Sequence, residues 1–197
     1  MMGSCSKNEM NEADVEYIQL PFEGNWYEGK EFSIQTWIDH DSGPCDHDFD
    51  DQELVVRSHM YYDKGSTLKS GDLITGSGKG ETRYYTILNG ENTYIGKTLF
   101  SWSYHVIGGD KQISINENTH FYIEDTPFSE KYLNELCKKF CVSSEHSNES
   151  VGFQSYRLGG DIYVIYNIET TKDKISGVLE NTEEVNYRRV NSPISDN

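Results

Sequence analysis

Three aspartates at alternate positions are the first residues in this chain whose spacing could do chemistry. Asp46, Asp48 and Asp50 are followed closely by Asp51 and Glu53. Alternating carboxylates resemble a calcium-binding loop, because Ca²⁺ is held by oxygen ligands. The EF-hand pattern is excluded, since Asp51 stands where that pattern requires glycine. We therefore expect either a Ca²⁺ site at the three alternating aspartates or a solvated acidic loop, with the solvated loop favoured.

Other reactive residues lack the partners that catalysis would require. His105 shares a predicted strand face with Ser101 and Ser103, but no nucleophile-elbow motif and no positioned aspartate accompany them. The segment 76–80 resembles a phosphate-binding loop only in its glycines, because a glycine follows Lys79 where a P-loop has Ser or Thr. We therefore predict that the protein is not an enzyme and carries no cofactor other than the Ca²⁺ considered above.

The charge balance excludes one large class of partners. The chain has 33 acidic and 17 basic side chains, which give a formal net charge of -16. Nucleic-acid binding requires Lys and Arg to neutralise phosphates, so this charge argues against it. The four cysteines show neither a CxxC pair nor a zinc-ligand spacing, and they leave the redox compartment open.

Short β patterns occupy most of residues 17–191, which we read as a single domain after a disordered polar tail at 1–16. Phe100, Trp102 and Tyr104 alternate with small polar residues, which is typical of a half-buried strand. The dipeptide 89–90, Asn-Gly, predicts a tight hairpin, and the glycine-rich segment 65–80 is expected to be a connection. The predicted strands are 18–22, 32–38, 53–62, 83–88, 94–107, 112–115, 120–124, 152–158, 162–168, 175–179 and 184–190.

One amphipathic helix is predicted at 127–141. Thr126 is suited to its N-cap and Pro127 to its first position. Apolar residues then recur at intervals of three and four, which gives a single apolar stripe. The fold class that follows is all-β, an antiparallel barrel or sandwich with one helix packed on it.

The segment 22–28, Phe-Glu-Gly-Asn-Trp-Tyr-Glu, resembles the opening motif of the lipocalins, a calycin family of β-barrels. The resemblance assigns structural roles to Gly24 and Trp26, since the family's Trp closes one end of an eight-stranded barrel. The segment 121–127 followed by the predicted helix resembles the family's last strand and its packing helix. The resemblance therefore implies a barrel over 22–125, and it leaves the strands of 152–190 as additions after the helix.

The amino-terminal segment 2–9 resembles the end of a bacterial lipoprotein signal, in particular that of Bacteroidetes surface lipoproteins. Small residues precede Cys5 and a polar tether follows it, but no apolar segment stands before them. The resemblance implies lipidation of Cys5 and an outward-facing position at the cell envelope. N-myristoylation is a poorer match to the same residues, and a cytoplasmic location follows if residue 1 is the true start.

These observations lead to a functional hypothesis and one alternative. The hypothesis is a non-enzymatic protein that holds a small apolar molecule in the β-barrel, since apolar pockets in barrel mouths bind such ligands. The alternative is a cell-surface module that contacts a protein or a glycan through an acidic, Tyr-rich face. The predicted ligand-binding residues are Trp37, Tyr85, Phe100, Trp102 and Tyr104. The sequence does not identify the ligand or the oligomeric state.

Overall fold

Every regular element of the described chain is a β-strand. The computed structural model describes residues 15–29, 31–36, 38–40, 52–117, 120–122, 151–153, 157–159, 162–179 and 182–191. The longest strands are β7, with 16 residues, and β8, with 17. The strands are β1 (Val15–Ile18), β2 (Asn25–Glu28), β3 (Phe32–Thr36), β4 (Ile38–His40), β5 (Gln52–Tyr62), β6 (Ser66–Ser70), β7 (Leu73–Leu88), β8 (Glu91–Ile107), β9 (Asp110–Glu117), β10 (His120–Tyr122), β11 (Val151–Phe153), β12 (Arg157–Gly159), β13 (Ile162–Thr170), β14 (Lys174–Leu179) and β15 (Glu184–Val190).

Eight of these strands form a closed antiparallel barrel. Their order is β7, β8, β9, β13, β14, β15, β2 and β5, and the pairing of β5 with β7 closes the cylinder. Closure leaves these strands with partners on both sides, which removes the exposed edges that an open sheet would present. The all-β antiparallel class predicted from the sequence is thereby confirmed. Of the two architectures expected, a barrel or a sandwich, the structure is a barrel.

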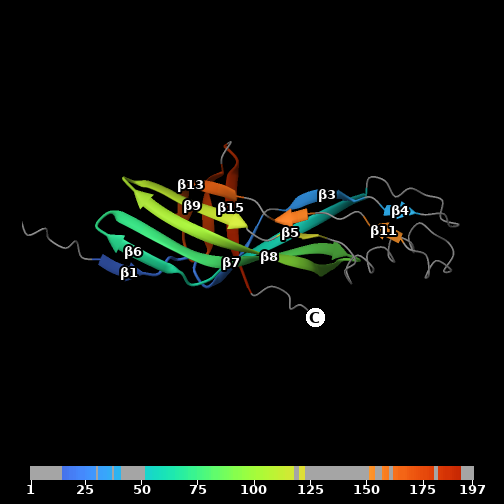
Figure 1. The fold of residues 1–197 in the computed structure, drawn as a ribbon, viewed down its shortest axis with the longest axis horizontal. Helices are drawn as coiled ribbons and strands as arrows, with labels where there is room; N and C mark the ends of the chain where they lie inside the picture. Colours follow the sequence, from blue (N-terminus) through green and yellow to red (C-terminus); the bar gives the residue numbers. More distant parts are fainter. Residues whose placement is uncertain are drawn as a thin grey trace, which may run out of the picture.

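The remaining strands extend this barrel or pair beside it. Because β7 is so long, one of its edges pairs first with β6 and then with β5. Strand β1 adds to β6, and β3 adds to β5. Figure 1 shows β1 and β6 near one end of the long axis, and the small pair of β4 and β11 at the other end.

The tight turn predicted from the Asn89-Gly90 dipeptide is confirmed. Asn89 and Gly90 both have positive φ, 53° and 80°, between Leu88 and Glu91, which pair with each other. Positive φ at both central residues is the mark of a type I′ hairpin turn. Gly108 and Gly109 join β8 to β9 in the same manner, with φ of 60° and 94°.

The glycine-rich segment 65–80 was expected to be a connection, and this expectation is wrong for most of it. Residues 66–70 form β6, and residues from 73 onward form the first half of β7. Gly76, Gly78 and Gly80 occupy alternate positions of β7 and therefore face the same way, toward the barrel interior. A Cβ atom on Gly78 would lie 2.5 Å from Trp102, and one on Gly80 would lie 2.2 Å from Phe100. The glycines make room for the large aromatic side chains of β8.

The strands that follow the predicted helix are part of the barrel. Strands β13, β14 and β15 connect β9 to β2, and without them the cylinder would remain open. The implied division into a barrel at 22–125 and later additions therefore differs from the observed topology. The helix predicted at 127–141 and the polar tail at 1–16, apart from its last two residues, lie outside the described residues.

Candidate functional site in the barrel interior

One end of the barrel interior is filled by aromatic rings. Phe22 is completely buried, and its ring makes edge contacts with Tyr62 at 5.1 Å and Trp102 at 5.2 Å between centroids. Its ring centroid lies 6.1 Å from that of Tyr104. Aromatic pairs in this range of distances stabilise a core beyond the area that they bury. Phe22 therefore closes this end of the barrel from within.

Trp102 is held in the same region by a hydrogen bond as well as by packing. Its indole Nε1 donates to the backbone carbonyl of Lys79 at 3.0 Å. The side chain is 2 % exposed, so a polar N–H at this depth requires such an acceptor. The bond holds the ring over the glycine positions of β7.

A buried carboxylate lies farther along the interior. Glu117, at the end of β9, is 6 % exposed and pairs in register with the inward-facing Phe100 of β8. Thr82 Oγ1 donates to Glu117 Oε1 at 2.8 Å, and Tyr84 Oη donates to Oε2 at 3.3 Å. The Tyr84 hydroxyl also lies 3.4 Å from Thr98 Oγ1. Strands β7, β8 and β9 thus present a polar cluster inside an otherwise apolar barrel.

Two tyrosines bring further hydroxyl groups into the interior. Tyr62 of β5 is completely buried, and within the part of the chain that the structure describes its hydroxyl has no hydrogen-bond partner. Tyr163 of β13 reaches across to β5, where its hydroxyl lies 3.9 Å from the Met60 sulfur. Sulfur is a weak acceptor, so the Tyr163 hydroxyl is only weakly satisfied by this contact. Buried polar groups are usually paired, which makes the Tyr62 hydroxyl a feature that requires an explanation.

The tyrosines and Glu117 of the interior lie close enough together to influence one another's ionisation. Burial raises the pKa of Tyr62 and of Tyr163 well above the ordinary value, and the charges of Tyr187 and Glu117 raise both pKa values further. Burial also raises the pKa of Tyr187 to about 12, with smaller contributions from Glu183 and Glu117. The phenols of this cluster therefore stay protonated at neutral pH.

Three of the five residues predicted to bind a ligand come together here. Phe100, Trp102 and Tyr104 are 3 %, 2 % and 6 % exposed and lie on the inward face of β8. Tyr85 is also buried, but its ring contacts His59 at 5.1 Å and Tyr94 at 5.7 Å, on the outer face of the sheet. It does not line the same space as the other three. Trp37 lies outside the described residues.

The two motif residues also have defined positions. Gly24 has a φ of 76°, in the left-handed region that favours glycine, and it ends the turn at 21–24 that leads into β2. Trp26 is half-buried on the outer face, with its ring 5.0 Å from that of Tyr61 and 5.1 Å below the Arg83 guanidinium. The resemblance placed this tryptophan at the closed end of the barrel, but Phe22 has that position.

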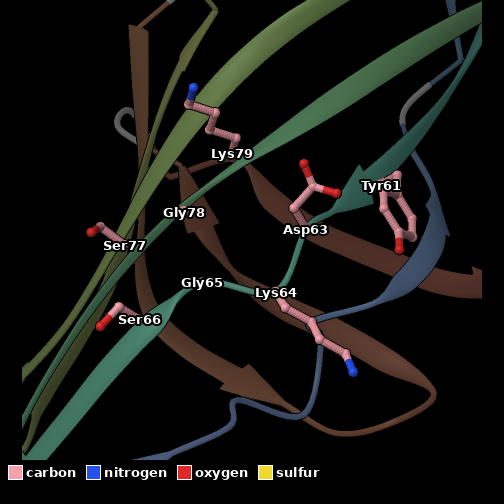
Figure 2. Close-up of a pocket in the computed structure, with 8 residues that line it drawn as sticks. All are labelled: Tyr61, Asp63, Lys64, Gly65, Ser66, Ser77, Gly78 and Lys79. Atoms are coloured by element: carbon pink, nitrogen blue, oxygen red, sulfur yellow. The ribbon is translucent and has the colours of Figure 1, made fainter.

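A hollow of about 600 Å³ opens on the outside of the barrel, between the 63–65 connection and β7. It forms where β7 changes partner from β6 to β5, since Gly78 lies between the two paired stretches. Figure 2 shows that its side chains diverge, with the amino groups of Lys64 and Lys79 pointing in opposite directions. The hollow has no set of groups that converge on one point.

Several predicted sites lie outside the described residues, namely Cys5 and the aspartates Asp46, Asp48 and Asp50. Across the described stretches, no group of three or more His, Cys, Asp or Glu side chains is placed to hold a metal ion. Those stretches also contain no helix of the length and apolarity needed to cross a membrane.

Sequence reasoning missed Phe22, Tyr62 and Glu117 as interior residues. Tyr62 ends the predicted strand 53–62, where alternation does not say which side is enclosed, and Glu117 lies beyond the predicted strand 112–115. The one usable signal was the glycine spacing of residues 76–80, because alternate glycines in a strand indicate close approach by large neighbours.

Comparison of this chain with protein-family models, with curated proteins and with solved structures finds no match. The closed eight-stranded barrel is nevertheless compatible with a lipocalin-like or calycin-like fold.

Proposed function

We propose that this chain is a non-enzymatic binding protein that holds a small molecule with an apolar body inside its β-barrel. The observation that carries the proposal is the Tyr62 hydroxyl, which is completely enclosed and has no partner among the described residues. A bound molecule would supply the missing hydrogen bond. The aromatic and aliphatic side chains around it would contact the apolar part of that molecule, as in most small-molecule sites.

The ligand would bind inside the barrel, next to the aromatic cluster around Phe22. Phe22 and Trp102 fill the closed end, so the proposed position lies toward Glu117 and Tyr84. Along β7 and β8, the inward-facing side chains change there from the rings of Trp102 and Phe100 to the hydroxyl groups of the paired residues Thr82 and Thr98. A molecule with both an apolar and a polar part matches this change of lining.

We further propose that the protein acts at the cell envelope, anchored through Cys5. This location rests on the lipoprotein-like segment 2–9 alone. At the cell surface, a protein that holds an apolar compound would be useful because such compounds dissolve poorly in water.

A second candidate function is a surface module that contacts a protein or a glycan. The observation that favours it is the outer aromatic pair of Trp26 and Tyr61, since Tyr61 also borders the outer hollow. Exposed Tyr17 and Tyr166 add to the tyrosine content of the outer surface. In this case the interior would remain an ordinary packed core.

Native mass spectrometry of protein purified from its own host tests the first proposal. We expect a non-covalent adduct of small-molecule mass that is released on denaturation, together with an acyl mass on Cys5. A bare polypeptide mass, with no adduct and no acyl group, would contradict both the carrier function and the anchored location. An acyl mass without an adduct would favour the surface module.

A further inference from the structure

We propose that two copies of this chain associate face to face through the outer surface of the sheet at the end where β1 and β6 lie (Figure 1). This surface, the tip face, spans six neighbouring strands in the order β1, β6, β7, β8, β9 and β13. Its large apolar members are Val15, Tyr17, Leu68, Leu73, Ile107 and Tyr166. The inference goes beyond the ligand proposed for the barrel interior and does not depend on it.

The strand register places these apolar side chains on one face. Tyr17 pairs with Leu68, Leu68 pairs with Thr75, and the same row continues through β8 and β9 to Tyr166 of β13. Directly opposed residues share a face, as do residues two apart on one strand. The second rule adds Val15, Leu73 and Ile107. All of these members except Leu68 are exposed, from 39 % for Tyr166 to 77 % for Tyr17.

The opposite face of the same strands has the reverse pattern. Val106, which faces the barrel core, pairs with Lys111, and its other partner on β7 pairs in turn with Lys69. Glu16 pairs with Lys69 on the same side. At this end, therefore, charged side chains continue the inward face, and large apolar side chains lie on the outward face. A contiguous exposed apolar patch is typical of a surface that a partner covers.

Charges at the two ends of the tip face identify a second copy as that partner. Asp72 and Asp110 lie in the turns at one end, beside Leu73 and Ile107. Lys64 and Lys79 lie at the other end, where they outnumber the neighbouring Asp63 (Figure 2). Within the described residues, none of these aspartates at the tip and neither lysine forms an ion pair. Each copy thus offers both an acidic end and a basic end.

A two-fold axis would join the unlike ends of two copies. Residues 72 and 79 are equally distant from the level of residues 75 and 76 on β7. An axis at that level would place Asp72 of each copy opposite Lys79 of the other, while the apolar side chains between them meet their equivalents. This self-complementarity is what an isologous dimer requires. Any other approach of two chains with a net charge of -16 would meet repulsion.

The size of the tip face sets the strength of the dimer. Six strands spaced about 4.8 Å apart, over about five residues of each, cover an area of about 24 Å by 16 Å. This is roughly 400 Å² on each copy, about half of what a standard stable interface covers. The dimer is accordingly weak and reversible.

Sedimentation equilibrium of the full chain tests the proposal under reducing conditions, from about 1 μM to about 1 mM, the range in which weak dimers dissociate. We expect a reversible monomer–dimer equilibrium. Leu73→Lys should raise its Kd about tenfold or more, because it places a charge within an apolar contact. Ile87→Lys is the matched control and should leave Kd unchanged. Ile87 lies on the same outer face of β7 and is 46 % exposed, against 45 % for Leu73, but it is at the far end of the strand.

A charge swap tests the two-fold arrangement. Lys79→Asp should weaken the dimer, because the acidic end of the other copy would then face an acid. Addition of Asp72→Lys to the same chain should restore the dimer, since each end then again meets an opposite charge. Both residues are exposed, so the fold should be retained, as an unchanged circular dichroism spectrum would show.

Four results would overturn the proposal. They are a chain that remains monomeric at every concentration, equal effects of Leu73→Lys and Ile87→Lys, a charge swap that fails to restore the dimer, and a monomer that binds phosphatidylcholine vesicles through Leu73. The last result would show that a membrane covers the tip face. Because Leu73 lies outside the barrel interior, a ligand adduct retained in Leu73→Lys would support the carrier function whatever the outcome for the dimer.

Discussion

Replacement of Gly78 by alanine tests the packing between β7 and β8. A Cβ atom at this position would lie 2.5 Å from Cζ2, 2.6 Å from Cε2 and 2.8 Å from Nε1 of Trp102. Carbon atoms in contact are about 3.5 Å or more apart, so the indole would have to move by about 1 Å. It is not free to do so, since Nε1 is bonded to the Lys79 carbonyl and Phe22 packs against the ring.

The expected effect of Gly78→Ala is a loss of about 1–3 kcal/mol in the free energy of unfolding, the range typical of overpacked cores. The lower entropy of the unfolded alanine chain would offset about 0.4–1 kcal/mol of this loss. Urea denaturation followed by circular dichroism measures the difference. Ser77→Ala, one residue away on the outer face, is the matched control and should change stability by less than about 0.5 kcal/mol.

A double-mutant cycle assigns the effect to the indole. Gly78→Ala should be less destabilising in a Trp102→Phe background, because the smaller ring lacks the atoms that the new methyl group would meet. If Gly78→Ala is neutral or stabilising in the otherwise unmodified chain, Trp102 does not lie against β7 as described. Equal losses in the two backgrounds would show that the cost comes from the backbone and not from the indole.

Three further predictions follow from single contacts. Phe22→Ala should lower the free energy of unfolding by about 3–5 kcal/mol, as for other buried phenylalanines, and a loss below about 1 kcal/mol in urea denaturation would refute its role in closing the barrel. Burial raises the pKa of Tyr27 to about 12 from 10.0, so above about pH 10 the unfolded chain loses this proton first. Stability should therefore fall between about pH 10 and pH 12, and in pH-dependent thermal melts Tyr27→Phe should make this fall less steep. Arg83→Leu should lower the free energy of unfolding by about 0.5–1 kcal/mol, because it removes the cation–π contact with Trp26. The same loss in a Trp26→Leu background would show that the pair does not interact.

Local sequence signals predicted most of the strands and the hairpin turn at 89–90, although they missed β2, β6 and the first half of β7. The Asn89-Gly90 pair is seldom compatible with anything but a tight turn, and the alternation at 94–107 marked the inward face of β8 correctly. These features depend on residues that are neighbours in the sequence. For the same reason β13, β14 and β15 were predicted close to their observed bounds.

Long-range arrangement was not predictable in the same way. Whether β13–β15 close the barrel or stand beside it depends on the pairing of β15 with β2, which are separated by most of the chain. The side of the sheet on which a tryptophan packs also depends on residues far away in the sequence. For this reason Trp26 was assigned to the interior and Phe22 was overlooked. The glycines at 76–80 were interpreted as part of a connection, whereas their common feature is the space that they leave for Phe100 and Trp102.

The interior polar cluster was missed for a related physical reason. Glu117 lies at the end of a strand where acidic residues are usually exposed, and only the closure of the barrel buries it. Tyr62 was one of 14 tyrosines, and no local pattern separates it from the others. Buried polar groups become visible only when their surroundings are known.

The most direct test of binding inside the barrel is a titration with a small apolar probe such as decanol followed by NMR of isoleucine δ1-methyl groups. Ile113, Ile115 and Ile165 are completely buried inside, whereas Ile107 and Ile162 are 59 % and 74 % exposed on the outside. The inner methyl signals should shift on binding, and the outer ones should not. Shifts confined to the outer methyl groups would contradict an interior site and would favour the surface module.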